Sequence, residues 1–126
     1  MNVKSNHRPT VLIVDDTPDN ITLLSSLLKG KYNTKIATSG ATALQIVATS
    51  PVDLILLDIM MPDMDGFETC RRLKADQHSK GIPVLFLTAK SLADEDVLGP
   101  DVGAVGFLRK PVNPELLFKC VETHLR

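Results

Sequence analysis

The sequence predicts an α/β fold in which helices cover both faces of a doubly wound, five-stranded parallel sheet. Short apolar stretches alternate with helical patterns five times along the 126 residues, without an internal repeat. Such alternation is typical of parallel sheets with right-handed crossovers. In addition, residues 54–57 (Leu-Ile-Leu-Leu) are apolar without interruption, as expected for a strand that is buried on both faces.

The first two strands and the helix between them follow from local signals. The apolar run 10–14 predicts the first strand. Thr17 and Pro18 provide an N-cap and a first helical residue for a helix that ends at Gly30. Residues 33–37 suit a second strand, and their more polar character places it at an edge of the sheet.

The middle of the chain repeats this pattern. Ser39 is a typical N-cap, and Ser50-Pro51 ends the helix that it opens. The strand at 54–57 then runs directly into Asp58, and a further helix is expected from about residue 66 to residue 75.

The segment that follows is less regular. Residues 82–87 predict a doubly buried strand that ends on Thr88. A weaker helix is expected at about 92–98, and it is short or broken because Gly99-Pro100 interrupts it. Residues 101–104 are then expected to form irregular chain.

One strand and one helix complete the chain. Residues 105–108 predict the last strand, which leads into Arg109, Lys110 and Pro111. Asn113 or Pro114 opens the final helix.

Composition limits the classes of function. A hydrophobic fraction of 44% can fill one core, and a net charge of −1 offers no basic surface for nucleic acid. No apolar run approaches the roughly 20 residues of a membrane span. Residues 1–9 are too polar for a signal peptide and are expected to form a flexible tail before a domain at 10–126. Cys70 and Cys120 lack metal-ligand spacing and are expected to be buried thiols in a cytoplasmic protein.

Polar residues follow four of the five predicted strands. The carboxyl ends of parallel strands lie along one edge of the sheet, where α/β folds bind ligands, so these residues are expected to converge. Three carboxylates at one edge repel by on the order of 4 kcal/mol per close pair, which favours a hard cation such as Mg²⁺ among them. The converging residues are Asp15, Asp16, Asp58, Thr88 and Lys110.

This set of side chains points to phosphoryl transfer. An ionised Asp58 can attack a phosphoryl group and hold it as an acyl phosphate without a general base. Lys110 and Mg²⁺ would neutralise the charge. The Thr88 hydroxyl can donate to a phosphoryl oxygen, and its movement would make a switch.

In these motifs the chain resembles the receiver domain of two-component response regulators, over about residues 10 to 126. The resemblance rests on Asp15-Asp16, on the stretch 58–66 (Asp-Ile-Met-Met-Pro-Asp-Met-Asp-Gly), on Thr88-Ala89 and on Lys110-Pro111. Each motif alone is weak, but all four occur in order at predicted strand ends. The resemblance implies a flavodoxin-like (βα)5 fold with strand order 2-1-3-4-5.

The resemblance also implies a role for each site residue. Asp58 would accept the phosphoryl group from a sensor histidine kinase or a phosphotransfer protein, as part of a phosphorelay. Lys110 and Thr88 would stabilise it, Thr88 and Phe107 would form the switch pair, and the Lys110–Pro111 bond would be cis. The implied Mg²⁺ ligands are Asp15 (through water), Asp16, Asp58 and the backbone carbonyl of Met60.

Alternative interpretations remain at this point. Asp15 and Asp16 can simply cap the first helix, and Phe107 can be a plain core aromatic. A haloacid-dehalogenase-like phosphatase also uses an aspartate nucleophile, but Met60 stands where its acid–base aspartate would be. An FMN-binding flavodoxin-like module would need a phosphate loop in place of the acidic stretch 15–20. A calcium loop around Gly66 lacks oxygen ligands at its first and last positions.

The chain departs from the family's pattern in its output region. Gly99-Pro100 interrupts the fourth helix, and Val105-Gly106 lacks an acidic residue that is often found before the switch aromatic. The downstream target, or a fused output domain, is therefore left open. Met60 and Lys90 flank the expected phosphoryl position, and because Met60 has no polar group to orient water, we expect slow self-hydrolysis.

Overall fold

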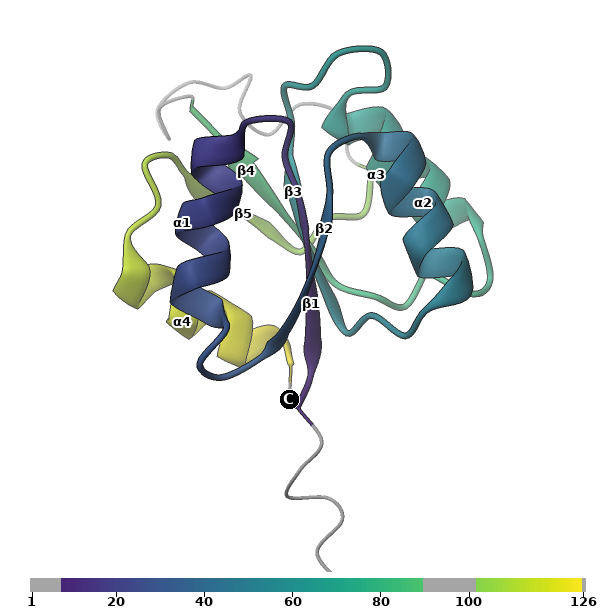
Figure 1. Ribbon diagram of the computed structural model, residues 1–126. Coiled ribbons are helices and arrows are strands. Elements are labelled where there is room, and N and C mark those ends of the chain that lie inside the picture. Colours follow the sequence, from purple (N-terminus) through teal and green to yellow (C-terminus); the bar gives the residue numbers. More distant parts are fainter. Residues whose placement is uncertain (1–7, 90–101, 126) are drawn as a thin grey trace, which may run out of the picture.

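A five-stranded parallel sheet forms the centre of the molecule, in the strand order β2-β1-β3-β4-β5 (Figure 1). The computed structural model describes residues 8–89 and 102–125. This order and the helices around the sheet confirm the predicted fold class. The elements are β1 (Thr10–Val14), α1 (Pro18–Leu28), β2 (Asn33–Ala37), α2 (Gly40–Thr49), β3 (Leu54–Asp58), α3 (Gly66–Ala75), β4 (Val84–Thr88), β5 (Gly106–Arg109) and α4 (Pro114–His124).

The helices form a layer on each side of the sheet. Helices α1 and α4 cover one face, and α2 and α3 cover the other (Figure 1). Each face has its own apolar cluster, because side chains alternate between the two faces along a strand. In β1, for example, Val11 and Ile13 belong to one cluster, whereas Leu12 and Val14 belong to the other.

The N-terminal elements lie where the sequence predicts them, and β2 is an edge strand. Pro18 occupies the first turn of α1, but the side chain of Thr17 makes no capping hydrogen bond. Residues 8 and 9 of the predicted tail already make hydrogen bonds to the folded part of the chain. The Pro9 carbonyl accepts a hydrogen bond from the Asn33 amide at 3.0 Å, and Arg8 donates to the Lys29 carbonyl at 3.1 Å. Residues 1–7 of the predicted tail lie outside the described residues.

Side-chain caps fix the start of three helices. The Ser39 hydroxyl accepts from the Thr42 amide at 3.1 Å, as predicted. The Asn113 side-chain oxygen accepts from the Leu116 amide at 3.1 Å, which places the start of α4 at Pro114. Asp65 caps α3 by accepting from the Glu68 amide at 2.9 Å. Each cap satisfies a backbone donor that would otherwise be unpaired at a helix start.

Two strands differ slightly from prediction. Strand β4 begins at Val84 rather than at residue 82, because Pro83 has no amide hydrogen to contribute to the ladder. Strand β5 begins one residue later than predicted, at Gly106. The predicted fourth helix and its break at Gly99-Pro100 lie outside the described residues, and residues 102–104 are irregular.

Candidate functional site

Asp58 is the last residue of β3, a strand with both faces covered. All five residues of β3 are buried, and Asp58 itself is only 3% exposed. One carboxylate oxygen, Oδ1, accepts a weak hydrogen bond from the Met60 amide at 3.4 Å and faces the Lys110 ammonium at 3.1 Å. The end of β3 therefore places a buried carboxylate at the carboxyl edge of the sheet.

Lys110 joins this carboxylate to a second one. Its Nζ atom lies 3.1 Å from Asp15 Oδ2 as well as 3.1 Å from Asp58 Oδ1, and the side chain is 18% exposed. Asp15 is fully buried, and its other oxygen, Oδ1, accepts from the Thr17 amide at 2.9 Å. One cation therefore bridges two buried carboxylates that come from different strands.

The charges at this edge shift the proton affinities of the groups. Burial raises the pKa of Asp58, and the nearby Asp15 raises it further, while Lys110 only partly opposes both effects. Burial alone would lower the pKa of Lys110, but its hydrogen bonds to Asp15 and Asp58 raise it overall. The site therefore keeps Lys110 charged and holds more negative charge than this one cation balances.

The donor atoms suit a hard divalent cation. One oxygen from each of Asp15, Asp16 and Asp58 lies within 4.8 Å of the others, and Asp16 is exposed where the other two are buried. An oxygen-only set with one open side fits Mg²⁺, which binds through a few carboxylates and keeps several waters. After burial, the charge of Asp15 is the next cause of the raised pKa of Asp58, and a further positive charge at this edge would oppose that repulsion.

The remaining predicted residues differ in their place on the strands and in their burial. Thr88 ends β4, the neighbour of β3, and is 2% exposed. Phe107 lies within β5, paired with Phe86, and packs partly buried against the core on the α2/α3 face. Met60 is 69% exposed. The Lys110–Pro111 peptide bond is cis, as the resemblance implies.

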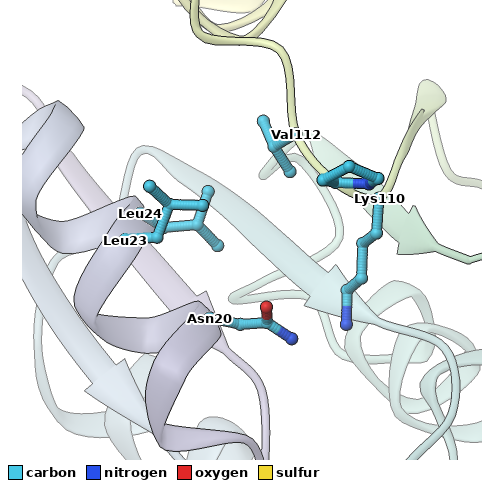
Figure 2. Close-up of a pocket in the computed structure, with 6 residues that line it drawn as sticks. Asn20, Leu23, Leu24, Lys110 and Val112 are labelled. Carbon is cyan, nitrogen blue, oxygen red and sulfur yellow. The ribbon is translucent and has the colours of Figure 1, made fainter.

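A small cavity lies beside the aliphatic part of Lys110. It has a volume of about 40 Å³ and is bounded by Asn20, Leu23 and Leu24 of α1 and by residues 110–112 (Figure 2). Such a volume holds no more than a few water molecules. Lys110 therefore lines this cavity opposite α1, while its ammonium group reaches the carboxylates.

We expect Asp58→Asn to stabilise the fold at neutral pH without Mg²⁺. Because the folded pKa of Asp58 is raised, the folded state binds this proton more tightly than the unfolded chain, and stability is lost as pH rises through the unfolded and then the folded pKa. Urea unfolding at neutral pH should show a gain of about 1 kcal/mol. The gain should shrink as the solution is acidified toward the ordinary carboxyl range.

The exposed Asp16 offers the matched control for that experiment. It belongs to the same acidic cluster but is open to solvent, so Asp16→Asn should change stability less than Asp58→Asn does. A loss of stability on Asp58→Asn at neutral pH would contradict the account of the charges at this edge.

Sequence patterns predicted which residues converge but not every contact between them. The predicted partner of Lys110 was Asp58, and the bond to Asp15 was not foreseen. The backbone amides of Thr17 and Met60, which donate to Asp15 and Asp58, carry no side-chain signal that could reveal them. Cys70 and Cys120 are free, as predicted, and only Cys70 is fully buried.

The chain is similar in sequence to proteins of known families. The family model of the response regulator receiver domain matches residues 11–122. A probable cyclic di-GMP phosphodiesterase of Vibrio cholerae serotype O1 is 46% identical over 126 residues, which are all of this chain and 29% of that protein. Response regulator PleD of Caulobacter vibrioides is 41% identical over 117 residues, or 92% of this chain and 26% of that protein. The chain thus spans less than a third of either relative.

Solved structures show the same fold. Chemotaxis protein CheY4 of Vibrio cholerae is similar with a TM-score of 0.86 at 33% identity, over 94% of this chain and 100% of that one. The receiver domain of sensor histidine kinase PA1611 from Pseudomonas aeruginosa has a TM-score of 0.86 at 25% identity, over 94% and 98% of the two chains. That structure has a magnesium ion coordinated in its active-site cleft.

Proposed function

Because this chain belongs to the response regulator receiver domain family and so to phosphorylation-dependent two-component signalling, we propose that Asp58 is its phosphoacceptor. The observation that carries this proposal is the position of Asp58. It is the buried end of β3, bridged by Lys110 to Asp15 and adjoined by Asp16. Neither the matched family nor its relatives support the phosphatase or flavin-binding alternatives.

The proposed reaction uses the carboxylate of Asp58 directly. An oxygen of Asp58 attacks phosphorus and forms a P–O bond while the bond from phosphorus to the donor breaks, so no proton need leave the aspartate. In the proposed scheme a sensor histidine kinase or a phosphotransfer protein supplies the phosphoryl group. Lys110, already 3.1 Å from Asp58, would then pair with a phosphoryl oxygen.

Magnesium fits the remaining acidic groups. Asp16 and Asp58 would bind it directly, Asp15 through water, and the Met60 carbonyl would complete the protein ligands. When bound, Mg²⁺ supplies positive charge that offsets the negative charge of the transferring group. Asp15 suits a role through water, because both of its oxygens already accept hydrogen bonds from Thr17 and Lys110.

The switch that we propose joins Thr88 at the end of β4 to Phe107 within β5. The Thr88 hydroxyl would donate to a phosphoryl oxygen, and Phe107, only partly buried on the adjacent strand, would turn inward to follow it. We further propose that the chain acts as a regulatory phosphoacceptor in the cytoplasm rather than as an enzyme with its own substrate. None of the described helices has the length and apolar character of a membrane span.

Acetyl phosphate tests the proposed function. With this donor and Mg²⁺, intact mass spectrometry should show one added phosphoryl group on the wild-type protein, and chelation of Mg²⁺ should suppress it. The proposal fails if no adduct forms with Mg²⁺ present. Rapid release of phosphate would instead favour the phosphatase, and a yellow purified protein would favour the flavin module.

The lifetime of the adduct is expected to depend on Met60. This thioether side chain is exposed two residues after Asp58, and it cannot hold an attacking water as an amide can. We expect Met60→Asn to shorten the phosphoryl lifetime by about two- to tenfold, the value of one added hydrogen bond in the transition state. The Met60→Leu variant serves as the control, because it changes the shape of the side chain without adding a polar group. A wild-type lifetime of only seconds, unchanged by Met60→Asn, would contradict this expectation.

A further inference from the structure

Three methionines lie in the loop that follows Asp58, and they differ sharply in exposure. Met61 is 8% exposed, and Met64 is half-buried beside Gly40 at the start of α2. Met60 is 69% exposed, more than any other large apolar side chain in the described part of the chain. A thioether so open to solvent contributes little to the core, and dissolved oxidants reach it freely.

Met60 is also joined to the reacting carboxylate through its backbone. Its amide donates to Asp58 Oδ1 at 3.4 Å, and its carbonyl is one of the proposed Mg²⁺ ligands. The side chain therefore starts from a residue that contacts the phosphoacceptor. A chemical change of this side chain would occur on a residue whose backbone is in contact with the phosphoacceptor.

Oxidation converts this side chain from apolar to polar. The thioether sulfur attacks a peroxide oxygen, the O–O bond breaks, and the products are a sulfoxide and, from hydrogen peroxide, water. Sulfur loses two electrons, and the peroxide gains them. The sulfoxide oxygen is a strong hydrogen-bond acceptor, whereas the thioether is a weak one.

We propose that Met60 is a site of oxidation by peroxides and that its sulfoxide shortens the lifetime of the phosphoryl group on Asp58. This inference rests on the proposed function. Water forms a new P–O bond, the bond between phosphorus and Asp58 breaks, and a water proton passes to the released phosphate or to solvent. A sulfoxide oxygen that accepts a hydrogen bond from the attacking water favours this step. The expected change is a lifetime about two- to tenfold shorter, as for one added hydrogen bond.

Limited treatment with hydrogen peroxide, followed by peptide mass spectrometry, tests the first half of the proposal. Met60 should gain one oxygen atom before Met64 does, and Met61 should react last, in the order of their exposure. Oxidation of Met61 or Met64 ahead of Met60 would overturn the assignment of the site.

Phosphoryl lifetimes test the second half. The wild-type protein is loaded with acetyl phosphate before and after oxidation. Peroxide should shorten the lifetime in the wild type and in Met64→Leu, but should leave that of Met60→Leu at its own untreated value. A methionine sulfoxide reductase should restore the wild-type value.

Two failures of this experiment are distinguishable. If the untreated wild type forms no adduct, the proposed function itself is wrong. If the untreated wild type forms an adduct and oxidation of Met60 to the sulfoxide leaves its lifetime unchanged, this inference is wrong. It is also wrong if peroxide changes the lifetime of Met60→Leu as much as that of the wild type.

Discussion

Replacing Lys110 by methionine is expected to lower the free energy of unfolding by about 3 kcal/mol at neutral pH without Mg²⁺. The side chain is 18% exposed and bridges Asp15 and Asp58, which are 0% and 3% exposed. Its removal leaves two buried carboxylates without their shared cation. The same change should slow phosphorylation by acetyl phosphate at least about tenfold, because a charge-neutralising group is lost from the site.

Both effects have controls within the chain. Lys119→Met changes an exposed lysine of α4 and should leave unfolding and phosphorylation near wild type. The stability deficit of Lys110→Met should narrow on acidification, because Asp58, whose pKa is raised by burial, then becomes protonated. It should also narrow when Mg²⁺ is added. A deficit that is independent of both pH and Mg²⁺ would mean that Lys110 acts mainly by packing.

Gly66→Ala is expected to cost about 3 kcal/mol of unfolding free energy and to impair phosphorylation as well. A Cβ atom on Gly66 would lie 2.5 Å from the Asp58 carbonyl oxygen and 2.7 Å from the Ile59 Cα atom. Both contacts are with backbone, so no side chain can swing away to relieve them. These close contacts can be relieved only if α3 and the end of β3 move apart. Such a movement would disturb the position of Asp58, the proposed phosphoacceptor.

Gly30→Ala is the matched control for this substitution. A Cβ atom on Gly30 meets nothing within 4 Å, so this variant should be neutral or slightly more stable than the wild type. Urea unfolding of the two variants and their rates of reaction with acetyl phosphate measure both effects. Equal stabilities for Gly66→Ala and Gly30→Ala would contradict the close approach between α3 and β3.

The sheet and the convergence of its strand ends were predictable because the signals are local and repeated. Four aliphatic residues in a row before Asp58 leave no polar face, so β3 had to lie inside the sheet. Parallel topology then places the residues after β1, β3, β4 and β5 at one edge, whatever the details of packing. Ser39 and Asn113 were recognisable as caps by residue type and position.

Features that depend on how closely two segments of the chain approach each other could not be predicted from the sequence. Gly66 was predicted as the start of a helix, and the structure shows that it also lets α3 approach the backbone of Asp58 closely. The bond from Lys110 to Asp15 depends on how far a flexible side chain reaches from the end of β5 toward the end of β1. Thr17 has the residue type of an N-cap, but its amide is bound to Asp15 and its side chain makes no capping bond.

The central claim is that the phosphoryl group resides on Asp58, and its most direct test is to locate that group. After reaction with acetyl phosphate and Mg²⁺, borohydride reduction converts a phosphorylated aspartate to homoserine, which peptide mass spectrometry assigns to one position. The account predicts homoserine at position 58 alone, and no phosphoryl adduct in Asp58→Asn. Homoserine at position 15 or 16, or an adduct that persists in Asp58→Asn, would contradict it.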